Sequence, residues 1–325
     1  MTFNLRKIGS TGVKVTDVAF GCASIGNLYR EIMDADALSV LESAWDSGIR
    51  YFDTAPHYGR GLSEQRLGKF LTIQQRSNFV ISTKVGRVLS AGKQVAEADS
   101  YMNPLPNDVR YDYSGDGIEE SLEGSRTRLG LKYIDIVYVH DIGQYTHGDD
   151  NAKHMDDFLG SGYERLLQLK QRGEIGAIGL GVNENEICIE IMRHAALDVI
   201  LLAGRLTLLD RSAEDVLVPL CKASNTSLVL GGVFNSGILA TGAIDGATYD
   251  YEPASESIKN KVIELQHQAT AMNIPLATAA LHFARRHYLS ASVLLGTAKP
   301  KSLIRNIDAL NDTIPKEFGE IFDEK

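Results

Sequence analysis

The stretch Tyr51–Leu71, which reads YFDTAPHYGRGLSEQRLGKFL, indicates how this chain is built. Its first residues form an apolar run typical of a buried strand, and Pro56–Gly59 supplies a turn. The remainder has the period of an amphipathic helix, with one apolar stripe made of Leu62, Leu67, Phe70 and Leu71. A strand that leads directly into a helix is the repeating unit of α/β proteins, so we expect this unit to recur along the chain.

Apolar runs of strand length recur, and helical patterns lie between them. The eight runs are Val18–Cys22, Tyr51–Ala55, Phe79–Val85, Ile134–His140, Ile175–Val182, Val199–Ala203, Ser227–Phe234 and Val293–Thr297. They are nearly continuous in Val, Ile and Leu, as expected of parallel strands covered on both faces. Eight alternations without a break in composition predict an α/β fold, a (β/α)8 TIM barrel in a single domain over residues 1–325.

The competing architecture is an open, doubly wound sheet. That fold would carry a GxGxxG turn after its first strand, and no such turn is present. Four other segments complete the expected fold. Thr2–Val15 predicts a short β-hairpin that closes the barrel floor, and Val216, Leu217 and Leu220 predict the buried stripe of one helix. Arg87–Asp116 has little periodicity and predicts a long βα loop or lid, followed by a shorter polar stretch at Asp141–Asp156.

Composition narrows the possible partners. The chain has 325 residues, 44% of them hydrophobic and 23% charged, with a net charge of −9, which argues against nucleic acid or an anionic membrane as the main partner. It lacks an apolar signal core at its N-terminus and any apolar stretch near the roughly 20 residues that span a bilayer. Three distant cysteines and no clustered metal ligands predict a cytoplasmic protein without disulfides or a metal.

Four polar residues follow three consecutive predicted strands. Asp53 ends the second run, Tyr58 lies in the turn beyond it, Lys84 ends the third run and His140 ends the fourth. Each has an ordinary interpretation alone: a turn cap, a packed phenol, a lysine reaching solvent or a satisfied core histidine. Neighbouring parallel strands lie roughly 5 Å apart, so the four side chains should converge at one rim of the barrel.

Such a convergence would have a definite chemistry. Lys84 and Asp53 would offset each other's burial, which neither charge could bear alone. The ammonium group would also stabilise the phenolate of Tyr58, so that this residue could exchange a proton with a substrate. His140 could donate a hydrogen bond to a substrate oxygen and set its orientation.

At these residues the chain resembles the aldo-keto reductase family over nearly its whole length. Phe52-Asp53-Thr54-Ala55, Tyr58-Gly59, Lys84 and His140 match the family's Asp, Tyr, Lys and His tetrad in order and spacing. The resemblance implies an NAD(P)-dependent oxidoreductase whose catalytic residues are Asp53, Tyr58, Lys84 and His140. Hydride would pass between a nicotinamide and a carbinol or carbonyl carbon, with Tyr58 as the proton acceptor or donor.

The same resemblance implies a set of cofactor contacts. They are Gly21, Cys22 and Ala23 at the first strand end, Asp53, Asn183 for the carboxamide, Phe234, Asn235, Ser236, Gly237 and Leu239 over the pyrophosphate, and Thr297 and Asn306 near the adenosine. Residues 235–237 could equally be an ordinary turn. Two positions depart from the family pattern, because Glu184 replaces a usual Asn and Leu206 replaces the Tyr that stacks on the nicotinamide.

The expected cofactor is NAD, with NADP possible. Members that prefer NADP commonly have cations at the positions of Gly296 and Ser302, where they pair with the 2′-phosphate. Both cations are missing here, although Lys299 or Arg305 could substitute for them. NAD should therefore serve at least as well as NADP.

The substrate signals point to sugar-oxidising members of the family. The segments 110–114, 204–209 and 231–239 resemble bacterial aldose 1-dehydrogenases that act on L-fucose or D-arabinose, and a pyridoxal 4-dehydrogenase is close to the same group. We expect oxidation of an aldose at C1 to the lactone. The expected substrate contacts are His57, Tyr58, Tyr113, His140 and Asp141. The alternatives are a pyridoxal 4-dehydrogenase, a general aldehyde reductase, or a non-catalytic, cofactor-sensing subunit of a membrane channel.

Overall fold

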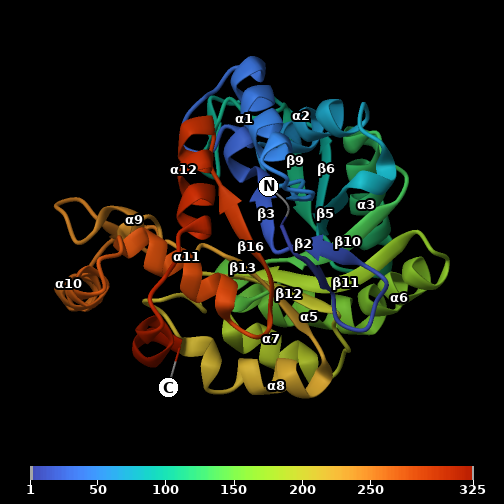
Figure 1. The fold of residues 1–325 in the computed structure, drawn as a ribbon. Helices are drawn as coiled ribbons and strands as arrows, with labels where there is room; N and C mark the ends of the chain where they lie inside the picture. Colours follow the sequence, from blue (N-terminus) through green and yellow to red (C-terminus); the bar gives the residue numbers. More distant parts are fainter. Residues whose placement is uncertain (1–2, 324–325) are drawn as a thin grey trace.

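The computed structural model describes residues 3–323, and these form a closed barrel of eight parallel strands surrounded by helices (Figure 1). The barrel strands are β3 (Val18–Gly21), β4 (Tyr51–Asp53), β5 (Val80–Val85), β10 (Ile134–His140), β11 (Ile175–Val182), β12 (Val199–Ala203), β13 (Ser227–Gly231) and β16 (Ser290–Gly296). They pair in chain order, and β16 closes the circle against β3. Each strand lies on one of the eight predicted runs, so the (β/α)8 prediction is confirmed.

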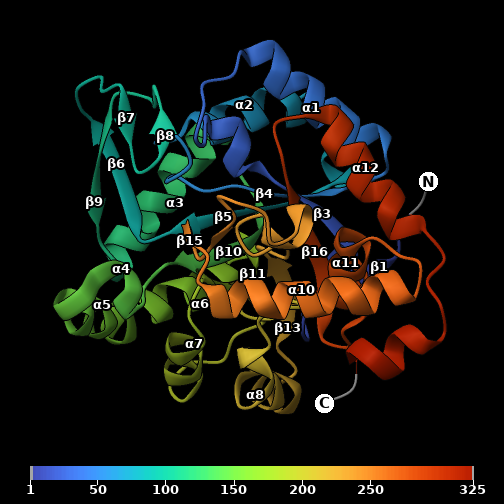
Figure 2. The same cartoon turned by 90° about the vertical axis from the view of Figure 1, so that its left-hand side faces the viewer.

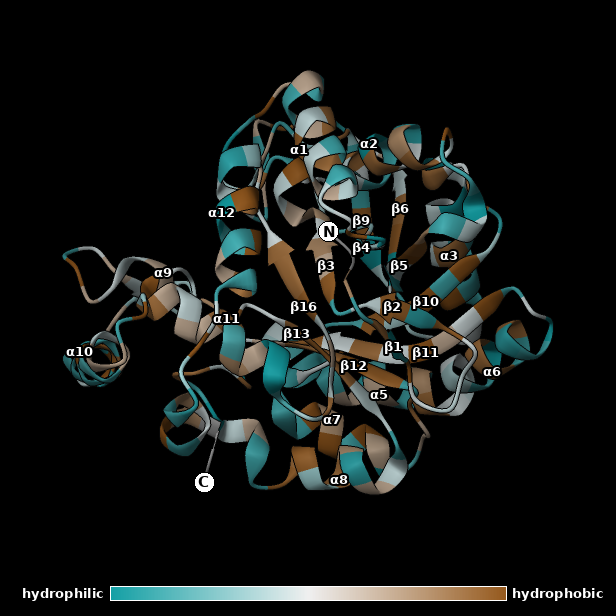
Figure 3. Ribbon diagram, viewed as in Figure 1, coloured by the Kyte–Doolittle hydropathy of each residue, from teal (hydrophilic) through white to brown (hydrophobic). Residues whose placement is uncertain are grey.

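Helices cover the outside of the barrel, as Figure 2 shows with the strands gathered at the centre. They are α1 (Asp34–Asp46), α2 (Leu62–Leu71), α3 (Gly115–Leu129), α6 (Tyr163–Gln171), α7 (Asn185–Met192), α8 (Leu217–Ser224), α11 (Leu276–Arg286) and α12 (Pro300–Asn311). The strands are mostly apolar, whereas the helices alternate between apolar and polar residues (Figure 3). This pattern reflects strands buried on both faces and helices buried on one.

The predicted stripe on α8 is wrong for two of its three residues. Val216 is 50% exposed and Leu220 is 37% exposed, whereas Leu217, Val218 and Cys221 are buried. The helix begins at Leu217, so its inward face is displaced from the expected one. Cys221 behaves as a small apolar residue in this face, which a search for Leu and Val did not detect.

The floor of the barrel is closed by the N-terminal hairpin, as predicted, although Thr2 lies outside the described residues. Strand β1 (Leu5–Lys7) pairs antiparallel with β2 (Lys14–Thr16). Ile8, Val13 and Val15 are buried in a cluster with barrel residues such as Val199, Tyr51 and Tyr138. The hairpin turn is joined to the barrel because the Gly9 backbone N–H donates to Ser227 Oγ at 2.8 Å.

The long βα segment predicted over Arg87–Asp116 contains four short strands that the sequence analysis did not identify. Strand β6 (Arg87–Ala91) pairs antiparallel with β9 (Asn107–Tyr111), and β7 (Glu97–Ala98) pairs with β8 (Tyr101–Met102) between them. Most side chains of this hairpin are half-buried or exposed, so the apolar alternation that identifies a strand is absent. The polar stretch after β10 likewise contains two short helices, α4 (Gln144–His147) and α5 (Asn151–Asp157).

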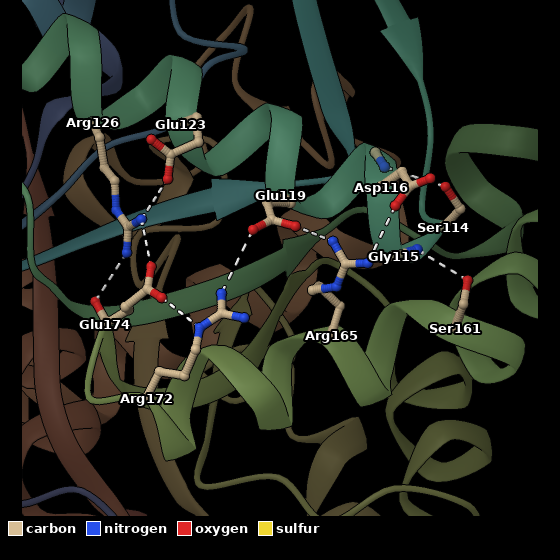
Figure 4. A network of polar contacts seen from close by, with 11 residues as sticks. Ser114, Gly115, Asp116, Glu119, Glu123, Arg126, Ser161, Arg165, Arg172 and Glu174 are labelled. Atoms are coloured by element: carbon tan, nitrogen blue, oxygen red, sulfur yellow. Dashed lines mark hydrogen bonds and ion pairs between the residues drawn. The ribbon is translucent and has the colours of Figure 1, made fainter.

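A network of ion pairs joins α3 to α6 and to the start of β11 (Figure 4). Arg126 and Arg172 both contact Glu174, at 2.9 and 2.6 Å, and Arg165 contacts Asp116 at 3.2 Å. Exposed pairs of this kind each contribute at most about 1 kcal/mol to the free energy of unfolding. The network supports the helices that follow β5 and β10, the strands that carry Lys84 and His140.

The segment between β13 and α10 (Glu256–Ala271) lies in front of the strands in Figure 2. It contains the short helix α9 (Ile238–Thr241) and the strands β14 (Thr248–Tyr249) and β15 (Glu252–Pro253). Two contacts attach it to the segment after β12, because Arg205 pairs with Asp250 at 2.8 Å and Tyr249 donates to Asp210 at 2.8 Å. No helix of the described chain is long and apolar enough to cross a membrane.

Candidate active site

The carboxyl ends of β4 and β5 bring Lys84 against Asp53 and Tyr58. Lys84 Nζ donates to Asp53 Oδ2 at 2.7 Å, to the carbonyl oxygen of Thr54 at 3.0 Å and to Tyr58 Oη at 3.0 Å. Lys84 is only 1% exposed and Asp53 is fully buried. All three ammonium hydrogens therefore have partners, which a buried lysine requires in order to remain charged.

Asp53 is fixed from its other side by a chain of hydroxyl groups inside the barrel. Ser82, its register partner on β5, donates to Asp53 Oδ1 at 2.7 Å. Ser82 in turn lies 3.1 Å from the hydroxyl of Tyr51, which contacts the hydroxyl of Tyr138 at 2.9 Å. Burial raises the pKa of Asp53, while Lys84 and Ser82 oppose that shift by stabilising the carboxylate. The carboxylate therefore has a fixed position directly behind the Lys84 ammonium.

The side chain of Lys84 has room to reach this position because β11 has a glycine beside it. A Cβ atom at Gly181 would lie 3.2 Å from Lys84 Cε, tighter than an ordinary van der Waals contact. Gly181 is also the register partner of His140 on β10. Gly181 is thus explained by packing around the lysine, whereas a Cβ atom at Gly179 would collide with the Val199 backbone on β12.

Tyr58 is held in the turn after β4 by close backbone packing. Gly59 has φ +64° and lies against the carbonyl group of Gly26, so that a side chain at either glycine would collide with backbone. The ring of Tyr58 packs beside those of Tyr101 and His140, with centroids 6.1 and 6.0 Å away. The hydroxyl group is thereby directed at Lys84, as the sequence predicted.

The ionisation of Tyr58 differs from the expected one. Burial raises the pKa of this phenol well above its ordinary value, and the carboxylates of Asp53 and Asp141 raise it further. The contact with Lys84 exists, but it does not outweigh burial in the protein without cofactor. Tyr58 therefore carries its proton at neutral pH.

His140 ends β10 and faces the same space. Burial lowers its pKa well below the ordinary value, and the charges of Arg87 and Lys84 lower it further, so the ring is neutral. Its Nδ1 is buried and has no hydrogen-bond partner among the described residues, whereas Nε2 lies 3.3 Å from Asp141 Oδ2. In the tautomer with its hydrogen on Nε2, the ring would have one donor, which Asp141 or a substrate oxygen could accept.

Of the other expected substrate contacts, Tyr113 and His57 lie in different surroundings. Tyr113 is fully buried behind His140, and its hydroxyl donates to the carbonyl oxygen of His140 at 2.7 Å. His57 is half-buried beside the site, with its ring centroid 5.8 Å from that of His140 and 5.3 Å from that of Tyr101. Burial lowers the pKa of His57 to about 2. His57 thus lines the site as a neutral ring, and Tyr113 supports the strand end.

A groove beside the tetrad has a cavity volume of about 540 Å³. It is lined by Leu28, Tyr29, Gly232, Val233, Phe234, Asn235, Ser236, Gly237, Thr248, Tyr251, Leu294, Leu295, Gly296 and Asn306. Five expected cofactor contacts are in this lining: Phe234, Asn235, Ser236, Gly237 and Asn306. None of the lining residues is a lysine or an arginine. The sequence did not identify Tyr29 and Tyr251, because their segments lack a motif.

The remaining expected cofactor residues lie outside this lining. Gly21, Cys22 and Ala23 pass from β3 into the short helix η1 (Cys22–Gly26), where Cys22 is buried. Thr297 accepts a hydrogen bond from the Lys299 backbone ahead of α12. Leu239 is fully buried in α9 and packs into a core cluster beneath the loop, because the apolar face of that short helix turns inward.

The loop after β13 has the geometry of a cradle for an extended ligand. Asn235 is buried, with φ +45°, and its side chain donates to the Gly204 carbonyl oxygen at 3.1 Å and accepts from Thr207 at 2.6 Å. The amide of Asn235 is thereby used to shape the loop. Gly237 has φ +101°, and a Cβ atom there would meet nothing within 4 Å. The Gly237 backbone is consequently open to close approach, as a bound pyrophosphate would need.

One departure from the family pattern, at Leu206, and one expected contact, at Asn183, have structural counterparts. Leu206 is 1% exposed within the core, so it offers no surface to a nicotinamide. Asn183, after β11, lies close to the phenol of Tyr251 in the β13–α10 segment, because burial raises the pKa of Tyr251 and the Asn183 side chain opposes that shift. Among the described residues, no group of three or more His, Cys, Asp or Glu could hold a metal ion. The residues present thus fit an extended nucleotide cofactor in the groove.

Comparison with known proteins agrees with this geometry. The model of the Aldo/keto reductase family matches residues 17–325. A pyridoxal 4-dehydrogenase of Microbacterium luteolum is 40% identical, with 96% of this chain and 94% of the relative covered. A D-threo-aldose 1-dehydrogenase of a Pseudomonas species is 36% identical, with 94% and 92% covered.

Solved structures show the same fold. The glycerol dehydrogenase of Gluconobacter oxydans has a TM-score of 0.75 at 21% identity, with 99% of this chain and 95% of that chain covered. The holo form of an aldo-keto reductase from Bacillus halodurans has a TM-score of 0.74 at 24% identity, with 97% and 93% covered. The chain belongs to the aldo/keto reductase family and is an NAD(P)-dependent oxidoreductase.

Proposed function

We propose that this enzyme oxidises the carbinol carbon of a cyclic hemiacetal to a lactone, with C1 of an aldose as the reacting carbon and NAD as the cofactor. The observation that carries the proposal is the position of Tyr58 Oη, 3.0 Å from Lys84 Nζ and beside the neutral ring of His140. This arrangement offers one proton-exchanging oxygen and one hydrogen-bond donor to a single substrate oxygen.

A cyclic hemiacetal reconciles the substrates that the relatives' names suggest. An aldose closes into a ring whose C1 bears both a hydroxyl group and the ring oxygen. Pyridoxal has a hydroxymethyl group next to its aldehyde and can close in the same way. Loss of hydride from that carbon and of the proton from its hydroxyl group gives a lactone directly. An open aldehyde would first have to add a water molecule before it could be oxidised to an acid. The cyclic hemiacetal already bears the hydroxyl group, so the tetrad does not have to catalyse that addition.

The tetrad residues divide the work of this oxidation. The bound nicotinamide supplies the hydride acceptor. Tyr58 takes the hydroxyl proton, and Lys84, 3.0 Å away, stabilises the phenolate that accepts it. Asp53 keeps Lys84 in place, and His140 donates from Nε2 to the reacting oxygen and orients it. In the reducing direction Tyr58 returns the proton, and the raised pKa of this residue means that it starts protonated.

Charge at the groove supports NAD over NADP. Gly296 and Asn306 lie at the end of the groove where the adenosine would bind, and none of the lining residues described above is a cation. Lys299 and Arg305 are exposed near this end and outside the lining. A 2′-phosphate would thus lack the partly buried cation that makes its recognition favourable.

The second candidate function is pyridoxal oxidation. The ring of Tyr101 lies nearly parallel to that of Tyr58, with 26° between the planes, and His57 adds a third ring to this wall. Such a wall suits a flat aromatic substrate at least as well as a sugar. The 40% identity to a pyridoxal 4-dehydrogenase makes this alternative a necessary part of any test.

A side-by-side assay tests the proposal. NAD reduction is measured with L-fucose, D-arabinose and pyridoxal, for the wild type and for Tyr58→Phe as the matched control. We expect turnover of the aldoses that the substitution abolishes. Turnover of pyridoxal alone would replace the sugar proposal with the second candidate. Cofactor binding without any turnover that Tyr58→Phe removes would indicate a sensor rather than an enzyme.

A further inference from the structure

A buried ion pair lies beside the tetrad and has no part in the proton transfer described above. Arg87 is three residues after Lys84 in the chain, and its guanidinium group donates to Asp141 Oδ2 at 2.7 Å. The side chain of Arg87 is 4% exposed and that of Asp141 is 23% exposed. Removing one partner of this pair would leave the other charge largely buried and unpaired.

The two oxygens of Asp141 differ in their surroundings. Oδ2 receives Arg87 and lies 3.3 Å from His140 Nε2. Oδ1 receives no hydrogen bond from any residue within 3–323. An ionised carboxylate has lone pairs for about four hydrogen bonds, so one side of Asp141 remains available to a ligand.

The backbone fixes the direction of this free side. Asp141 has φ +45°, a left-handed conformation that a non-glycine residue adopts at some energetic cost. Its N–H donates to the Gly181 carbonyl oxygen at 3.0 Å, so the residue is attached to the neighbouring strand. Asp141 Oδ2 lies 3.3 Å from His140 Nε2, and the His140 ring packs 6.0 Å from that of Tyr58, so the carboxylate lies on the same side of the barrel as the phenol.

The spacing then suggests what Asp141 contacts. His140 Nε2 is the atom that would hold the hydroxyl oxygen on the reacting carbon, and Asp141 Oδ2 lies 3.3 Å from it. Oxygens on adjacent carbons of a sugar ring are separated by about one hydrogen-bond length. A substrate oxygen held by His140 would therefore place the neighbouring hydroxyl group within reach of Asp141.

We propose that Asp141 accepts a hydrogen bond from the hydroxyl group next to the reacting carbon, so that the enzyme selects 2-hydroxy hemiacetals, with Arg87 as the positioning residue that keeps the carboxylate charged and in place. This inference rests on the proposed hemiacetal oxidation and names the part of the substrate that is recognised. A site built to receive a hydroxyl group discriminates strongly against a substrate without it, because the buried acceptor is then unpaired.

The test compares D-arabinose with 2-deoxy-D-ribose, which differs from D-arabinose only by the missing 2-hydroxyl group. Wild-type kcat/KM should favour D-arabinose by about 10- to 100-fold, the range for a hydrogen bond to a charged group. In Asp141→Ala this ratio should fall to within about threefold of unity. The ratio cancels any effect on His140 or Tyr58 that both substrates share.

A second variant guards against misfolding caused by the unpaired arginine. Arg87→Met combined with Asp141→Ala removes both charges and should lose the same selectivity. Equal loss of activity on both sugars, with an unchanged ratio, would overturn the inference while leaving hemiacetal oxidation intact. A wild type that does not distinguish the two sugars would overturn it as well. Absence of turnover with every hemiacetal would instead overturn the proposed function itself.

Discussion

The ammonium nitrogen of Lys84 lies 3.0 Å from the phenolic oxygen of Tyr58, while the carboxylate of Asp53 holds the same ammonium at 2.7 Å. The lysine therefore connects the structural and the chemical halves of the site. The ion pair with Asp53 offsets the cost of burying both charges. The contact with Tyr58 Oη stabilises the phenolate of the residue that exchanges the proton. Stability and activity should consequently respond differently to substitutions within this trio.

Lys84→Met leaves the carboxylate of Asp53 buried without its partner, so we expect the free energy of unfolding to fall by about 3–5 kcal/mol. The double variant Asp53→Asn, Lys84→Met removes both charges and should regain part of that loss. Both variants should lose catalysis by about 10²- to 10⁴-fold, because neither has a cation beside Tyr58. Urea unfolding and kcat/KM measure the two effects. A double variant no more stable than Lys84→Met would contradict the pairing argument.

The direction of the reaction should respond to pH through Tyr58. Burial raises its pKa well above the ordinary value, so the phenolate needed for oxidation becomes more abundant as pH rises. The rate of oxidation should increase by up to about tenfold per pH unit across neutral and mildly alkaline pH. Reduction uses the protonated phenol, so its rate should not change with pH over that range.

His140 is the other ionisable group that could shape this pH profile. Burial lowers the pKa of His140 well below its ordinary value, so the ring stays neutral at neutral pH. Neither direction should therefore show an inflection near pH 6.5, the ordinary value for histidine. An inflection there that disappears in His140→Gln would mean that this ring titrates during turnover. Measurement of kcat/KM from pH 6 to pH 10 in both directions decides the matter.

The tetrad could be inferred from sequence because the barrel aligns the ends of its strands. Once Asp53, Lys84 and His140 were assigned to the ends of consecutive strands, topology alone placed them together. Asp141 was predicted as a substrate contact because it is the next residue in the chain after His140. Arg87 did not, since its partner is 54 residues away and its segment appeared to be an irregular loop.

The parts that sequence missed depend on contacts between loops. Tyr251 has no motif, and its contact with Asn183 depends on the path of the long segment after β13. The hairpin β6–β9 has few buried apolar residues, so periodicity could not detect it. Hydrophobic periodicity predicts which face of a helix or strand is buried, but it does not predict which loops contact one another.

Cofactor preference should change with one residue of α12. Ser302 is half-buried in the first turn of this helix, and Asn306, one turn later, lines the groove. Ser302→Arg should place a guanidinium group near the 2′ position and lower KM for NADP about tenfold or more, with KM for NAD changed by less than about threefold. Ile304→Arg, at a residue 45% exposed on the same helix, is the matched control. Equal effects from both substitutions would indicate general electrostatic attraction rather than recognition of the phosphate.

The half-buried His57 beside the site should limit stability in acid. The pKa of His57 is about 2 in the folded protein, against about 6.5 in the unfolded chain. Between these values only the unfolded chain binds the proton, so His57 lowers the free energy of unfolding by about 1.4 kcal/mol for each pH unit below 6.5. The contribution vanishes above pH 6.5, where both states are neutral.

His57→Gln should therefore gain about 2 kcal/mol relative to the wild type between pH 8 and pH 5, whatever its effect at pH 8. His267→Gln, at an exposed position on α10, provides the matched control for the loss of a histidine. Urea unfolding at pH 5, 6, 7 and 8 gives the slope for each variant. Parallel slopes for His57→Gln and the wild type would show that the His57 ring takes up a proton in the folded state as well. The prediction that burial keeps this ring neutral in acid would then be wrong.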